Sequence, residues 1–301
     1  MTEQFRGLYS IAQTPFDEVG AFLWEDFERE VDWIARAGAH GLVWPVMASE
    51  FTVISYLEKV RGMRVAVEAI AGRIPVVIGV AATTEAEATD LAREAGAVGA
   101  DAIIAMPPWA TKLVNHDLVR HYYASIADAA GLPVFVQNAG APLGSSLPAS
   151  FIVELFRDIP LVQYLKEEKP PQGQSISEVV EIADPAIKGV FSGGACRWLI
   201  SQYHRGVCGS MPGSYITDID AHIWNLLEAG DEAEAHRVHA DKMVLENALG
   251  AMPARASKEV ARRRGVISCA ASRSFGALQL DAVDQADLDY AWSVVEPHFR
   301  I

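Results

Sequence analysis

The sequence alternates eight times between a short apolar run and a longer amphipathic segment. Parallel strands that are buried on both faces form near-continuous apolar runs, and the helices between them place apolar residues every three to four positions. The eight runs expected to be strands are residues 7–13, 41–46, 75–81, 102–107, 133–138, 162–167, 187–192 and 209–213. The helices expected between them are residues 24–37, 56–71, 85–97, 117–130, 148–157, 175–183 and 196–204.

Eight successive strand–helix units favour a closed barrel, because an open doubly wound sheet usually has five or six strands and leaves edges to protect. We therefore expect an α/β fold, the (β/α)8 TIM barrel. After the eighth strand the sequence contains only helical patterns, with breaks near Gly230, Pro253 and Gly265. We expect residues 1–230 to form the barrel that carries the active site, and residues 231–301 to form a C-terminal helical extension.

The composition limits the partners of the chain. Its formal net charge is -14, so a nucleic acid backbone would be repelled. A small anionic substrate remains possible, because one buried cation and a few backbone N–H groups can outweigh a distant surface field. No run of about 18 uninterrupted apolar residues predicts a membrane span, and the first residues show no basic region followed by an apolar run, so we expect no targeting signal.

The cysteine and histidine patterns indicate neither disulfides nor metal. Cys196, Cys208 and Cys269 are few, odd in number and scattered, which fits neither a disulfide framework nor a zinc ribbon. The eight histidines lack the spacing of a metal cluster. We expect a cytoplasmic protein without a bound metal.

Reactive groups in a (β/α)8 barrel stand at the C-terminal ends of the strands, which directs attention to Lys166. It lies in the largely apolar sixth strand, followed by Glu167 and Glu168. Desolvation disfavours the ammonium form and yields the free amine that attacks a ketone carbonyl. The alternative is a lysine at a strand end that pairs with one of these glutamates in solvent.

Two further strand ends carry residues of interest. Gln137 and Asn138 end the fifth strand, and buried amides need partners. They could bind a substrate hydroxyl or carboxylate, or they could satisfy loop backbone. After strand seven, Ser192-Gly193-Gly194 could hold a phosphate, approach a carboxylate or simply form a turn.

Several landmarks together resemble one enzyme family. They are Lys166, Thr14-Pro15-Phe16, Ser49-Glu50-Phe51, Pro107-Pro108, Gly193 and Gly209-Ser-Met211. With them the chain resembles, over its whole length, the dihydrodipicolinate synthase / N-acetylneuraminate lyase family of class I enzymes. The resemblance implies a Schiff base between Lys166 and the keto carbon of a 2-oxo acid, with the backbone N–H groups of Ala48 and Ser49 holding its carboxylate. It implies no cofactor, and a homo-oligomer that is a dimer or tetramer.

The sequence departs from the family pattern in a way that points to one reaction. Gln137 replaces the tyrosine that usually shuttles protons, and glutamine has no group that titrates near neutrality. A subgroup, the L-2-keto-3-deoxyarabonate dehydratases, carries this glutamine and the Lys-x-Glu pattern of Lys166 and Glu168. The resemblance therefore implies dehydration of a 2-keto-3-deoxy sugar acid, with Glu168 as the acid–base group.

The remaining site residues and the alternatives complete these expectations. Matching positions assign substrate contacts to Trp109, Asn138, Gly193 and Met211, and Trp44 and Met47 would make the pocket less polar. Aldol cleavage or a hydratase–aldolase reaction is the alternative within the family. A barrel that binds a phosphorylated ligand, or a non-catalytic relative, is the alternative of another class.

Overall fold

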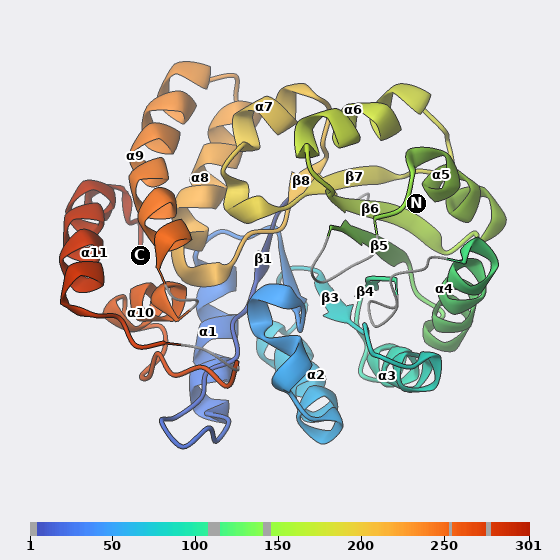
Figure 1. The fold of residues 1–301 in the computed structure, drawn as a ribbon, viewed down its shortest axis with the longest axis horizontal. Coiled ribbons are helices and arrows are strands. Elements are labelled where there is room, and N and C mark those ends of the chain that lie inside the picture. Colours follow the sequence, from blue (N-terminus) through green and yellow to red (C-terminus); the bar gives the residue numbers. More distant parts are fainter. Residues whose placement is uncertain (1–4, 108–114, 141–145, 253–254, 275–277) are drawn as a thin grey trace. The chain divides into compact units, whose positions relative to one another are not determined.

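The computed structural model describes residues 5–107, 115–140, 146–252, 255–274 and 278–301. Eight parallel strands follow one another in sequence order around a closed barrel, with helices between them (Figure 1). The strands are β1 (Gly7–Ile11), β2 (Gly41–Trp44), β3 (Val76–Gly79), β4 (Ala102–Ala105), β5 (Val134–Ala139), β6 (Val162–Glu168), β7 (Gly189–Ser192) and β8 (Gly209–Ser210). The predicted (β/α)8 TIM-barrel fold is confirmed.

The helices also follow the predicted order. The α-helices are α1 (Trp24–Arg36), α2 (Tyr56–Ile70), α3 (Glu85–Ala97), α4 (His116–Ala130), α5 (Ala149–Asp158), α6 (Gln172–Ile182), α7 (Leu199–His204), α8 (Thr217–Glu228), α9 (Glu232–Ala251), α10 (Ala256–Arg263) and α11 (Ala282–Val295). The short 3-10 helices are η1 (Met47–Ser49), η2 (Phe51–Val53), η3 (Gly194–Cys196), η4 (Ser214–Ile216) and η5 (Glu296–His298). Among the described residues, no helix is long and apolar enough to span a membrane.

Most strands are shorter than the sequence predicts, and two elements, β8 and α7, are shortened for a visible local reason. Strand β8 has two residues, because Pro212 soon follows and proline has no N–H to donate to a ladder. Helix α7 begins at Leu199 rather than at Cys196, because Ala195 and Cys196 both adopt left-handed backbone conformations, with φ of 56° and 55°. A right-handed helix cannot pass through such residues.

The chain forms two compact units, which are described separately. The first unit contains the residues up to Gly7 and Tyr56–Met211, and the second contains Leu8–Ser55 and Pro212–Ile301. The second unit therefore groups the three helices after residue 231 with α1 and β2. A separate domain beginning at residue 231 stays a prediction, although the turn between α8 and α9 does fall there.

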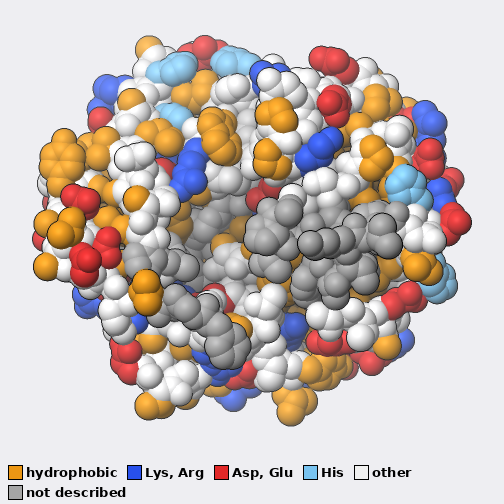
Figure 2. Space-filling view, in the orientation of Figure 1, with side chains coloured by type: hydrophobic (Ala, Val, Ile, Leu, Met, Phe, Trp, Pro, Cys, Tyr) orange, Lys and Arg blue, Asp and Glu red, His pale blue; other side chains and the backbone are white. Residues whose placement is uncertain are grey.

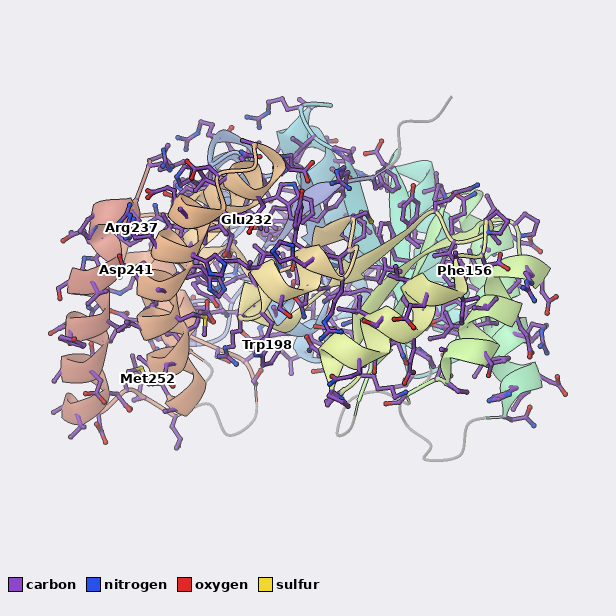
Figure 3. The ribbon with its side chains drawn as sticks, turned by 90° about the horizontal axis from the view of Figure 1, so that it is seen from above. Phe156, Trp198, Glu232, Arg237, Asp241 and Met252 are labelled. Atoms are coloured by element: carbon purple, nitrogen blue, oxygen red, sulfur yellow. The ribbon has the colours of Figure 1, made fainter. Side chains whose placement is uncertain are left out.

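The C-terminal helices pack through α9. Its buried side chains recur on one face, and include Val238, Lys242 and Leu245, while Arg237 and Asp241 lie on the outer face, labelled in Figure 3. Helix α9 contacts both α8 and α11. The fully buried Lys242 ammonium lies 2.6 Å from the Asp220 carboxylate of α8, so an ion pair joins these two helices in the core.

The visible surface carries charges of both signs. Acidic and basic side chains alternate with neutral and apolar ones over the face drawn in Figure 2. The described residues drawn there thus show no continuous stripe of positive charge that would suit a polyanion.

A buried glutamate on α1 generates a pH prediction. The Glu30 carboxylate accepts hydrogen bonds from the Gln13 N–H (2.7 Å) and the Ser214 hydroxyl (2.6 Å). Burial raises the pKa of Glu30 from 4.5 to about 7. Folded Glu30 therefore keeps a proton that the unfolded chain releases, and this part of the stability falls as pH rises from 4.5 to 7.

We expect Glu30→Gln to reduce the loss of unfolding free energy between pH 4.5 and 8 by on the order of 2 kcal/mol. Urea denaturation of wild type and variant at both pH values measures this difference. Glu181→Gln, which changes an exposed glutamate of α6, is the matched control and should leave the pH dependence unchanged. Equal pH dependence in Glu30→Gln and wild type would contradict the assignment.

Candidate active site

The register between β5 and β6 brings the predicted catalytic residues together. Gln137 is the strand partner of Lys166, and Ala139 is the partner of Glu168. Side chains two residues apart on a strand point to the same face. Lys166 and Glu168 therefore share one face of β6, and Gln137 lies beside them on β5.

The three polar groups meet at one carboxylate oxygen. The Lys166 ammonium nitrogen lies 3.3 Å from Glu168 Oε2, and Gln137 Nε2 donates a hydrogen bond of 2.7 Å to that same oxygen. The Lys166 side chain is 3% exposed and that of Glu168 is 14% exposed. In the structure Glu168, and not Glu167, is the partner of Lys166. The pair is buried rather than exposed to solvent.

Aromatic rings occupy the same face two residues before these polar groups. Phe135 on β5 stacks on Tyr164 on β6 with 4.7 Å between ring centroids, and meets Phe191 on β7 edge-on at 5.3 Å. Phe191 is also the strand partner of Lys166. The lysine therefore stands at the edge of an apolar layer.

Gly193 contacts Glu168 directly, which explains the glycine after strand seven. A Cβ atom at this position would lie 2.0 Å from Glu168 Oε1 and 2.5 Å from its Cδ. Only a residue without a side chain leaves room for the carboxylate. The backbone here approaches a carboxylate of the protein itself, which argues against the phosphate-binding alternative, because a phosphate would be repelled by that charge.

Asn138 and Glu167 lie on the opposite face of the two strands. Asn138 Nδ2 donates to Glu167 Oε2 at 2.8 Å and to the Leu147 carbonyl, while its Oδ1 accepts from the Leu147 N–H at 2.7 Å. Burial raises the pKa of Glu167 to about 7. These contacts favour the second sequence-based interpretation of Asn138, in which its amide satisfies loop backbone and Glu167 rather than the substrate.

The second unit contains the turn expected to bind the substrate carboxylate. Ser49 donates its N–H to the Val46 carbonyl at 2.9 Å and its hydroxyl to the Ala12 carbonyl at 2.6 Å. The N–H of Ala48, an exposed residue, has no acceptor within the described part of the chain. Of the two predicted donors, Ala48 is therefore available, whereas Ser49 is already engaged in holding the turn.

Three other predicted residues have different outcomes. Trp44 does not line a pocket, because its ring is fully buried against Phe27 and its Nε1 donates to the Thr14 hydroxyl at 3.0 Å. Met211 is buried, and its N–H donates to the Ser192 carbonyl, so its contact with a substrate stays a prediction. Trp109 lies outside the described residues.

Known proteins with similar sequences point to one family. The family model for the dihydrodipicolinate synthetase family matches residues 4–285. The chain belongs to this family. L-2-keto-3-deoxyarabonate dehydratase of Azospirillum brasilense is 30% identical over 219 residues, which are 72% of this chain and 71% of that protein.

One further relative is similar in sequence, and one solved structure has the same fold. A 4-hydroxy-tetrahydrodipicolinate synthase of Nitratidesulfovibrio vulgaris (strain DP4) is 29% identical over 82% of this chain and 83% of its own length. The crystal structure of dihydrodipicolinate synthase from Rhodopseudomonas palustris superposes with a TM-score of 0.88 at 22% identity, covering 98% of this chain and 99% of that one. The dihydrodipicolinate synthetase family consists of lyases, and this chain is a lyase of that family.

The contact between Gly193 and Glu168 generates a structural prediction. We expect Gly193→Ala to push the Glu168 carboxylate away from Lys166 and to cost about 1–3 kcal/mol of stability, as other small-to-large changes at packed sites do. A crystal structure of the variant and its urea denaturation check both parts. Gly173→Ala is the control, since its Cβ would meet only the side-chain end of Arg205, at 3.0 Å. An unmoved Glu168 in the variant would contradict the prediction.

Proposed function

We propose that this protein dehydrates a 2-keto-3-deoxy sugar acid through a Schiff base at Lys166. One observation carries the proposal: a single oxygen of Glu168 contacts both the Lys166 nitrogen and the Gln137 amide. The relative from Azospirillum brasilense, a keto-deoxy sugar acid dehydratase, supports the substrate class. Family members act on small molecules and are typically oligomeric, so we also propose a homo-oligomer, either a dimer or a tetramer.

The first steps of the proposed reaction build an electron sink. The Lys166 amine adds to the keto carbon C2 of the substrate, and water leaves as the imine forms. Protonation of the imine nitrogen allows electrons to be drawn from C3. Because Glu168 lies 3.3 Å from the lysine nitrogen, its carboxylate is within reach of the carbon next to the imine and can take the C3 proton.

The later steps remove the hydroxyl group. The electron pair left on C3 is delocalised onto nitrogen and then expels the hydroxyl on C4. Glu168 returns the proton that it took, so the hydroxyl departs as water. Hydrolysis of the imine releases Lys166 and consumes the water lost at the start, and the net reaction removes one water from the substrate.

Gln137 has a positioning role in this scheme. Its amide donates to Glu168 Oε2, the oxygen beside the Lys166 nitrogen, and so orients the carboxylate that takes the C3 proton. An amide cannot itself pass on a proton. Proton transfer therefore rests on Glu168 alone, which differs from a scheme with a titrating tyrosine at the same position.

Imine formation is the first test. Incubation with pyruvate and sodium borohydride should add to Lys166 the mass of pyruvate less one oxygen atom, measured by mass spectrometry of the peptides. Lys166→Ala should remain unmodified. Absence of the adduct in wild-type protein would contradict imine formation with pyruvate-like ligands, and would favour a non-catalytic or phosphate-binding barrel.

Glu168→Gln tests the proton transfer separately. The variant should lose turnover of 2-keto-3-deoxy sugar acids by about a hundredfold or more, the range typical of general acid–base groups. Borohydride trapping at Lys166 should persist, because the lysine remains. Glu154→Gln, which changes an exposed glutamate of α5, is the control. Normal turnover in Glu168→Gln would remove this residue from the mechanism.

The products distinguish dehydration from carbon–carbon cleavage. A 2,5-dioxo acid formed without pyruvate supports the dehydratase; it arises when C5 of the unsaturated imine loses a proton, C3 gains one and the resulting enol becomes the aldehyde. Pyruvate and an aldehyde would instead support the alternative, an aldolase or hydratase–aldolase, and would rule out dehydration as the main reaction. A panel of 2-keto-3-deoxy acids, assayed by chromatography of the products, makes this comparison.

A further inference from the structure

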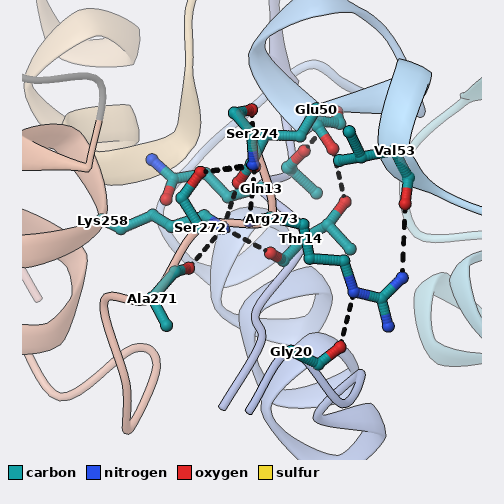
Figure 4. Close-up of polar contacts among 12 residues, drawn as sticks. Gln13, Thr14, Gly20, Glu50, Val53, Lys258, Ala271, Ser272, Arg273 and Ser274 are labelled. Atoms are coloured by element: carbon teal, nitrogen blue, oxygen red, sulfur yellow. Dashed lines mark hydrogen bonds and ion pairs between the residues drawn. The ribbon is translucent and has the colours of Figure 1, made fainter. Parts of the chain in front are cut away.

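Lys258 on α10 is a buried lysine that contacts three oxygen atoms (Figure 4). Its ammonium group donates to the carbonyl of Thr14 at 2.7 Å, to the carbonyl of Ala271 at 2.9 Å and to Glu50 Oε1. Its side chain is 4% exposed. All three donors of the ammonium group are thus used, and the Phe16 ring lies 4.6 Å from the nitrogen.

Glu50, the acidic partner of Lys258, is held on both of its oxygen atoms. While Lys258 binds Oε1, Oε2 accepts from the hydroxyls of Ser272 (2.6 Å) and Ser274 (2.8 Å) and from the N–H groups of Arg273 (3.0 Å) and Ser274 (2.9 Å). Burial alone would raise the pKa of Glu50, but the Lys258 charge and the serine hydroxyls hold it below its ordinary value. Glu50 is therefore an ionised anchor.

The anchor lies directly behind the turn that carries Ala48. Glu50 follows η1, donates its N–H to the Met47 carbonyl at 3.1 Å, and adopts a left-handed conformation with φ of 57°. A residue with a side chain costs about 1 kcal/mol or more in that conformation, and persists there when its surroundings fix it. The contacts of the Glu50 carboxylate supply that constraint.

Lys258 also braces the turn from its other side. Thr14 donates its hydroxyl to the Ser49 carbonyl at 2.7 Å, and the Thr14 carbonyl accepts from Lys258. Glu50, which follows the turn, and Thr14, which supports it, are therefore both bound to the Lys258 ammonium group. A planar guanidinium would not place its donors in the same way, so arginine is not an equivalent residue here.

We infer that Lys258 is a positioning residue for substrate binding: through Glu50 and Thr14 it fixes the η1 turn, and with it the Ala48 N–H that the family resemblance assigns to the substrate carboxylate. The inference rests on the proposed function. It assigns the C-terminal segment that contains Lys258 a role in affinity for the carboxylate, separate from the chemistry at Lys166.

Lys258→Met, which removes the charge and keeps most of the chain length, tests the inference. We expect the pyruvate concentration for half-maximal borohydride trapping at Lys166 to rise by about tenfold, with the trapping rate at saturating pyruvate changed by less than about threefold. Ser274→Ala, which removes one donor to Glu50, should give a smaller rise in the same direction. A half-saturation unchanged in Lys258→Met would overturn the inference.

Two control variants separate positioning from general destabilisation. Lys242→Met removes another fully buried lysine of the same unit, and Arg262→Gln changes a partly exposed residue of α10. Both should leave the half-saturation at the wild-type value, even where Lys242→Met lowers the unfolding free energy. If Lys242→Met raises the pyruvate concentration for half-maximal trapping as much as Lys258→Met does, the effect is general destabilisation and the inference fails.

Amide hydrogen exchange keeps the two proposals distinguishable. Exchange in the peptide that contains residues 47–50 should be faster in Lys258→Met than in wild type, and unchanged in Arg262→Gln. Wild-type protein that is not trapped by pyruvate contradicts the proposed function, whatever the exchange result. Wild-type protein that is trapped, with equal exchange in Lys258→Met and wild type, overturns only the positioning role of Lys258.

Discussion

The chemistry of the site depends on the alternation of side chains along β6. Lys166 and Glu168 point to one face and Glu167 points to the other, so two neighbouring carboxylates acquire different surroundings. Glu168 meets the lysine and the Gln137 amide, whereas Glu167 is enclosed with Asn138 on the far side. Shifting the register of β6 by one residue would move Lys166 and Glu168 together to the far face and bring Glu167 to the face of Gln137.

The architecture could be predicted from the sequence because the signals for it are local. Each strand of the barrel overlaps one of the predicted apolar runs. Proline accounts for the short β8, and left-handed residues account for the late start of α7. Lys166 and Glu168 could be singled out because they end one strand. The separation of Glu167 from Glu168 also follows from the two-residue period of a strand, and that signal was present in the sequence.

Other parts of the site depend on contacts between residues far apart in the chain, which no local pattern encodes. The pairing of Glu50 with Lys258 joins positions 208 residues apart. A lysine in a short amphipathic helix ordinarily indicates a solvated face, and nothing near Lys258 distinguishes it from the arginines that follow. The sequence does not predict the complete burial of Trp44 for the same reason, since that burial depends on α1 packing against β2.

The bond between Lys258 and Thr14 spans 244 residues, and this distance has a consequence for how the protein is made. During synthesis the segment with Met47–Ser49 emerges before the lysine that holds it. Until Lys258 emerges, Glu50 in its left-handed conformation has no ionic partner, and the η1 turn lacks the contacts that fix it. A nascent chain thus contains Lys166 before it contains the group that holds the η1 turn.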